Sequence, residues 1–180
     1  MSIFLDEIIG NDKVKTILSN ILQSENIPHA FLFTGTDGVG KENAALSFTK
    51  ELNQLKENLE KSKSISTQID NLSEPYIKYI LPLPRGKNET DQNDPYEKLN
   101  EDEVDQINLE FKKKSQNHYY RIHIPKANFI KINSIRDIKK FLSFSYEDIK
   151  YRVILISQAH IMNEESQNAL LKNLEEPPEG

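Results

Sequence analysis

The feature that most limits the fold of this chain is the run Gly35-Thr36-Asp37-Gly38-Val39-Gly40-Lys41, which fits the pattern G-x-x-x-x-G-K. Residues 30–34 before it are apolar and predict a short buried strand, and residues 41–52 after it predict a helix. Between a strand and a helix, such a loop turns successive N–H groups toward phosphate oxygens, and the helix N-terminus adds partial positive charge. The run therefore predicts a nucleotide-binding phosphate loop with Lys41 at the outer phosphates. The alternative is a glycine-rich turn with a solvated lysine.

The eighth position of this motif ordinarily holds Ser or Thr, whose hydroxyl binds Mg²⁺, but here it holds Glu42. A carboxylate can bind magnesium, yet it is longer than a hydroxyl and adds negative charge beside the phosphates. Two like unit charges about 4 Å apart repel by roughly 1 kcal/mol in water and about 4 kcal/mol at an effective dielectric constant of 20. Glu42 therefore argues against an ordinary magnesium–nucleotide site.

A second position gives the same indication. Hydrolysis in this fold needs acidic residues at the end of a core strand, where they hold magnesium and orient the attacking water. The aliphatic strand predicted at residues 152–156 is followed by Ser157 and Gln158, and neither is anionic. Gln158 could orient a water but cannot act as a base, and Glu164 is the acid that could substitute. We interpret Glu42, Ser157 and Gln158 as degenerate positions and expect no catalytic residues.

The remaining patterns alternate between helix and strand. Residues 53–75 predict an exposed continuation of the second helix that fades into loop, and residues 85–118 predict a loop followed by a short helix. Strands that alternate with helices imply right-handed crossovers and a parallel sheet, so we expect a P-loop NTPase fold of three α/β/α layers. Another helix is predicted at residues 11–23. Three more are predicted from their first residues, which are Asn100 with Glu103 as capping-box partner, Ser134 with Asp137 as its N3 partner, and Asn163. The other predicted strands cover residues 76–81 and 119–124.

Composition excludes several classes of function. The net charge of −5 argues against a chain that coats nucleic acid by bulk electrostatics, although it leaves room for a local basic patch. The absence of cysteine excludes disulfides and thiolate zinc sites, and four scattered histidines argue against any other metal site. We find neither a signal-peptide pattern nor an apolar run long enough to span a membrane, so we expect a cytoplasmic protein without a membrane partner.

Several short stretches resemble bacterial DNA polymerase III clamp-loader subunits, which are AAA+ proteins. They are Phe4 with residues 8–10 and 27–35, residues 130–132 with 135–136, and above all residues 168–178 with the sequence NALLKNLEEPP. The resemblance covers about residues 1–52 and 119–180, with a weaker match at residues 76–81. Residues 85–118 have no counterpart in it and look like an insertion. The resemblance implies one RecA-like AAA+ module over residues 1–180, incomplete at its C-terminus. The last strands, the lid, the collar and a Ser-Arg-Cys motif would then lie beyond Gly180.

The departures from the family pattern imply the function. Motor subunits carry a magnesium-binding Thr or Ser, an Asp-Glu pair and a four-cysteine zinc module, and this chain lacks all three. The resemblance therefore implies a delta-prime-like stator, a non-enzyme that requires no cofactor, has no Mg²⁺ and leaves ATP or ADP binding at residues 35–41 open. Its implied partners are gamma/tau-type and delta-type subunits, the sliding clamp and primer–template DNA. The alternatives are an active gamma/tau-like ATPase motor and a nucleotide-sensing subunit without turnover.

Other charged segments each allow two interpretations. Lys112 to Lys114 are a nucleic-acid patch or, more simply, a complement to a helix C-terminus. By the resemblance, Arg136, Lys139 and Lys140 face DNA and Lys172, Glu175 and Glu176 line a subunit interface, whereas the simpler interpretation of both sets is a solvated helix surface. The insertion at residues 85–118 binds a partner or is a tolerated surface loop.

Overall fold

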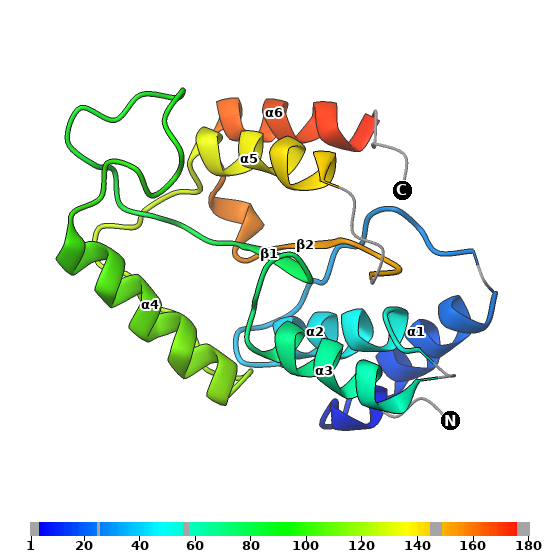
Figure 1. Cartoon of the computed structure of the whole chain (residues 1–180). Coiled ribbons are helices and arrows are strands. Elements are labelled where there is room, and N and C mark those ends of the chain that lie inside the picture. Colours follow the sequence, from blue (N-terminus) through cyan, green and yellow to red (C-terminus); the bar gives the residue numbers. More distant parts are fainter. Residues whose placement is uncertain (1–3, 25, 56–57, 145–148, 176–180) are drawn as a thin grey trace.

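The computed structural model describes residues 4–24, 26–55, 58–144 and 149–175 (Figure 1). Within those ranges no helix is both long enough and apolar enough to cross a membrane. In chain order the elements are η1 (Leu5–Glu7), α1 (Asp12–Ser24), α2 (Lys41–Leu52), α3 (Leu59–Asp70), β1 (Ile77–Ile80), α4 (Glu101–Gln116), α5 (Ile132–Ser143), β2 (Val153–Ile156), η2 (Ala159–Ile161) and α6 (Glu164–Glu175).

Two of the predicted strands form a parallel pair. β1 and β2 align from Ile77 opposite Val153 to Ile80 opposite Ile156. In Figure 1 this pair lies between α5 and α6 on one side and α1, α2 and α3 on the other. The expectation of a mixed α/β structure with a parallel sheet and helices on both faces is therefore confirmed for the described residues, in which the sheet has two strands.

The alternation of side chains along β1 explains why both faces are covered. Ile77 and Tyr79 belong to a core cluster with Leu46 of α2, Ile69 of α3 and Ile107 of α4. The next residue, Ile80, points to the opposite face and packs with residues of α5. A third apolar cluster joins η1, α1 and α2 through Leu5, Ile8, Leu18, Ala44, Phe48 and Leu52.

The predicted strand at residues 30–34 is wrong. The segment has no strand assignment, and Leu32 is 82% exposed. Phe31 packs edge-on against Phe48, with ring centroids 5.1 Å apart. An apolar run becomes a strand only when a neighbour completes its hydrogen-bond ladder, and among the described residues none pairs with this segment.

The strand predicted at residues 119–124 is also wrong, because side chains of α4 bind the backbone of this segment. Lys114 Nζ donates to the carbonyl of Tyr120 at 2.9 Å. The N–H of His123 donates to Glu110 Oε2 at 2.8 Å. These bonds occupy backbone groups that a neighbouring strand would otherwise use.

Residues 53–75 do not continue α2. A separate helix, α3, begins after Asn58, whose side chain accepts a hydrogen bond from the N–H of Lys61 at 2.9 Å. Its buried face consists of Ile65 and Ile69 with the small residues Ser62 and Ser66. Because only two of these four buried residues are large and apolar, the sequence pattern of the segment resembled that of an exposed helix.

The capping predictions had mixed outcomes. The box of Asn100 and Glu103 is present at the start of α4, and Asn163 caps α6 by accepting from the N–H of Ser166 at 3.0 Å. The predicted cap at Ser134 is wrong, because α5 already begins at Ile132 and Ser134 is buried inside it. Its supposed partner Asp137 instead forms an ion pair with Lys78 of β1.

Candidate functional site

The predicted phosphate loop lies immediately before α2, and most of its residues are exposed. Gly38 and Gly40 have positive φ angles of 78° and 87°, which glycine adopts readily and other residues do not. Lys41 is the first residue of α2, and its ammonium donates to the loop's own carbonyls, at 2.9 Å to Gly35 and 2.8 Å to Thr36. The Lys41 ammonium, which the sequence predicts to bind a phosphate, thus donates to carbonyls of the loop itself.

The structure brings together two of the three positions that we interpret as degenerate. Ser157 follows β2 and donates a hydrogen bond from Oγ to Oε1 of Glu42, in the first turn of α2. Tyr79 of β1 donates from its hydroxyl to Oε2 at 3.0 Å, and the same Oε2 forms an ion pair with Lys114 of α4. Both oxygens of the Glu42 carboxylate are therefore bonded within the protein.

These contacts set the ionisation of the site. Burial by itself would raise the pKa of Glu42, but the charge of Lys114 and the hydrogen bonds from Lys114, Ser157 and Tyr79 outweigh burial and hold the pKa below its ordinary value. Burial, followed by the charge of Glu42, raises the pKa of Tyr79 far above its ordinary value. At neutral pH the site is accordingly an ionised carboxylate beside a neutral phenol.

Lys114 is the main site residue that the sequence analysis missed. Its side chain is 3% exposed, so the interpretation of Lys112 to Lys114 as a nucleic-acid patch is wrong for this residue. Besides contacting Glu42, its ammonium donates to the carbonyls of His118 at 2.7 Å and Tyr120 at 2.9 Å. A signal was present, because Lys114 follows Ile107 and Phe111 at helical spacing and so belongs to the buried stripe of α4.

The segment after α4 lies directly against the loop. The hydroxyl of Tyr119 accepts a hydrogen bond from Asn43 Nδ2 at 3.3 Å, and its ring is so close to Gly40 that an added Cβ would lie 2.9 Å from Cε1. Arg121 forms an exposed ion pair with Asp37 at 2.9 Å. We call residues 110–121 the clasp, because its side chains reach Asp37, Gly40, Glu42 and Asn43.

Gly40→Ala should therefore destabilise the protein more than Gly38→Ala. Both substitutions place a side chain at positive φ, at a cost of about 1–2 kcal/mol, but an added Cβ at Gly38 meets no atom within 4 Å. The extra loss at Gly40 measures the close approach of Tyr119. Urea unfolding of both variants checks this, and equal losses would mean that the clasp does not hold Tyr119 against the loop.

The donor set at this site does not fit magnesium. Mg²⁺ prefers an octahedral shell of oxygens and retains several waters. Glu42 is the carboxylate at the metal-binding position of the motif, and an ammonium and two hydroxyls already bond to it. Gln158 has left-handed backbone angles, φ 55° and ψ 43°, and precedes η2. In the ranges that the structure describes, no group of three or more His, Cys, Asp or Glu could hold a metal.

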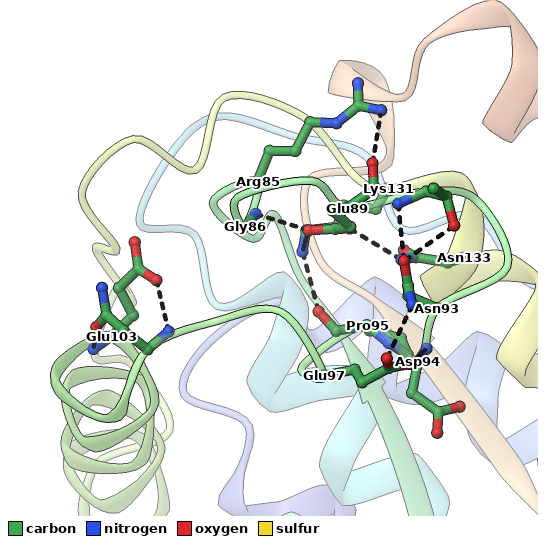
Figure 2. Close-up of polar contacts among 12 residues, drawn as sticks. Arg85, Gly86, Glu89, Asn93, Asp94, Pro95, Glu97, Glu103, Lys131 and Asn133 are labelled. Atoms are coloured by element: carbon green, nitrogen blue, oxygen red, sulfur yellow. Dashed lines mark hydrogen bonds and ion pairs between the residues drawn. The ribbon is translucent and has the colours of Figure 1, made fainter.

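The loop at residues 85–97 is attached to α5 by a buried ion pair. Glu89 and Lys131 are 2.8 Å apart, and their side chains are 5% and 4% exposed. Figure 2 shows Glu89 also accepting from the N–H of Gly86 at 2.7 Å and from Asn133 Nδ2 at 2.9 Å. Lys131 donates in addition to the carbonyl of Pro95 at 2.9 Å.

The same loop contacts the residues expected to face DNA. Arg136 donates to the carbonyl of Asp91 at 3.1 Å, and Lys140 contacts Asp94 at 3.4 Å. Lys139 is exposed on the same helix. On α6, Lys172 and Glu175 are exposed, as a subunit interface or a plain helix surface requires, and Glu176 lies outside the described residues.

Comparison with known proteins identifies relatives along nearly the whole chain. The family model described as "DNA polymerase III, delta subunit" matches residues 10–127 and 118–180. The chain is 27% identical over 173 residues to DNA polymerase III subunit tau/gamma of Haemophilus influenzae and 29% identical over 176 residues to subunit tau of Escherichia coli, in each case over 96% of this chain. It is 28% identical to subunit gamma of Buchnera aphidicola over 98% of this chain.

These relatives are much longer than this chain. The aligned region is 19% of the Haemophilus protein, 20% of the Escherichia protein and 37% of the Buchnera protein. No solved structure matches the chain significantly.

Proposed function

The chain belongs to the DNA polymerase III clamp-loader subunits of the AAA+ class, and from this membership we propose that it is a delta-prime-like stator that does not hydrolyse ATP. Its module would have the P-loop NTPase fold, and its place would be in the cytoplasmic assembly that loads the sliding clamp onto primed DNA. Energy for loading would come from ATP bound by neighbouring subunits of gamma/tau type.

One observation carries this proposal. The carboxylate of Glu42 is bonded to Lys114, Ser157 and Tyr79, in the region where a motor subunit needs a hydroxyl, a metal and an acidic pair. A carboxylate bonded in this way is poorly placed to bind a metal. Neither Ser157 nor Gln158 can act as a base toward water. The arrangement supports a subunit that assembles without turnover.

The exposed face of α6 supports a role in assembly. Leu171 is 51% exposed and Leu174 is 37% exposed, and the charged residues Lys172 and Glu175 are exposed beside them. Apolar side chains with a charged rim are typical of subunit interfaces. We propose that this face contacts a neighbouring subunit, and that Arg136, Lys139 and Lys140 on α5 lie toward the DNA.

The test is ATP turnover in a reconstituted assembly that contains the full-length protein. The phosphate-loop lysine of every gamma/tau-type partner is replaced by alanine, so any remaining turnover must come from this subunit. We expect none above the rate of the partners alone. Turnover that requires this subunit would overturn the stator function.

The named relatives give one observation in favour of a motor, because they are tau and gamma subunits. A motor would retain turnover in the assembly with silenced partners. A nucleotide-sensing subunit would show no turnover but would bind ADP or ATP in an equilibrium titration. The same preparation therefore separates the three functions.

A further inference from the structure

The buried ammonium of Lys114 has the contacts of a bound cation. Three oxygen acceptors surround it, namely the Glu42 carboxylate and the carbonyls of His118 and Tyr120. An ammonium has three N–H donors, so this set can satisfy it completely. A buried lysine whose N–H donors all have acceptors is costly to displace, because its charge would then lack a partner.

The ammonium of Lys114 contacts Glu42, the residue at the position that would ordinarily bind a metal. Glu42 occupies the motif position that ordinarily binds Mg²⁺, and it links Lys114 to Ser157 at the end of β2. The negative charge that the sequence places beside the phosphates is thus offset by a positive charge from another part of the same chain.

The clasp holds this cation in place through contacts on both sides of Lys114. Glu110 accepts from the hydroxyl of Tyr120 at 2.9 Å and from the N–H of His123 at 2.8 Å. The hydroxyl of Tyr119 accepts from Asn43 and from the N–H of Ile9 at 3.4 Å. Lys114 therefore cannot leave Glu42 without disturbing the segment that covers the loop.

We infer that the insertion at residues 85–118 supplies an internal cation, Lys114, that takes the place of a divalent metal ion at Glu42. The site consequently excludes Mg²⁺ and Mn²⁺, and any phosphate group at residues 35–41 binds without a metal. This inference rests on the proposed function, since it explains how the family site loses its metal. It also gives the insertion a specific role.

Manganese is the probe for the test, because its unpaired electrons broaden NMR signals of nearby nuclei. The full-length protein is titrated with Mn²⁺ and the amide signals of residues 42–44 and 157 are followed. The wild type should show no selective broadening there. Lys114→Met should show selective broadening there, with an apparent affinity for Mn²⁺ on the order of tenfold higher than that of the wild type.

Two further variants make the result specific. Glu42→Gln combined with Lys114→Met should lose the new site, and Lys112→Met, which removes an exposed lysine of the same helix, should behave as the wild type. Wild-type broadening at residue 42 as strong as in Lys114→Met would overturn the inference. So would a folded Lys114→Met variant that binds no Mn²⁺.

The wild-type titration decides the question even if Lys114→Met fails to fold. A buried, fully bonded ammonium exchanges its protons slowly enough to be followed in a protein with ¹⁵N-labelled lysine. The signal of Lys114 should persist and stay unshifted when Mg²⁺ is added, and its loss would show that the metal displaces it. Neither measurement involves ATP turnover. The inference can therefore fail while the stator function stands, and the stator function can fail while the inference stands.

Discussion

Lys114→Met is expected to lower the free energy of unfolding by about 3 kcal/mol, the lower end of the range for breaking a buried ion pair, because the Glu42 side chain remains 30% exposed. The substitution leaves the Glu42 carboxylate without its cation. It also removes the donor to the carbonyls of His118 and Tyr120. Urea unfolding followed by circular dichroism measures the loss, and Lys112→Met should change stability by less than about 0.5 kcal/mol.

The dependence on pH separates the loss of charge from a simple loss of packing. In the wild type the pKa of Glu42 is lowered from 4.5, so its stabilising contribution is present above that pH and is lost as pH falls through the lowered pKa. Without Lys114, burial should raise the pKa of Glu42, and its contribution is then present below pH 4.5 and lost as pH rises. The difference between variant and wild type should therefore be largest near neutral pH and shrink in acid. A difference that stays constant from neutral pH to pH 4.5 would point to packing alone.

Glu89→Ala is expected to lower the free energy of unfolding by about 3–5 kcal/mol, since it leaves the buried ammonium of Lys131 without its carboxylate. The N–H of Gly86 and the side chain of Asn133 lose an acceptor as well. Hydrogen exchange should rise in the loop between residues 85 and 97, because Glu89 fastens that loop to α5. Urea unfolding and hydrogen exchange check the two effects.

The matched control is Asp94→Asn in the same loop. Asp94 and its partner Lys140 have side chains that are 66% and 61% exposed, so their ion pair should contribute less than about 1 kcal/mol. Equal losses for the two substitutions would mean that burial does not decide the strength of these pairs. Since the pKa of Glu89 is lowered, its contribution too should be lost as pH falls through that pKa.

The sequence predicted the parts of the fold that depend on local patterns. The apolar spacing of α1 and α2, the capping box of α4 and the aliphatic run of β2 each lie within one continuous segment. The errors at residues 30–34 and 119–124 concern strands, and a strand depends on a partner that is often distant in the chain. The strand propensity of a segment does not show which other segment would pair with it.

Sequence reasoning singled out Glu42 and its hydroxyl partner Ser157, but not the basic residue Lys114 that contacts Glu42. Glu42 and Ser157 stood out because each departs from a motif whose chemistry requires another residue. Lys114 fits no motif, and only its position on the buried stripe of α4 distinguishes it from Lys112. A lysine that follows apolar residues at helical spacing is therefore a candidate for an internal ion pair.

The hydrogen bonds from Lys41 to the carbonyls of Gly35 and Thr36 have a consequence for ligand entry. A phosphate that recruits Lys41 must compete with two charged hydrogen bonds, each worth about 1.5–3 kcal/mol. Binding is then an exchange of acceptors, and the observed affinity is reduced by the fraction of molecules in which the lysine is released.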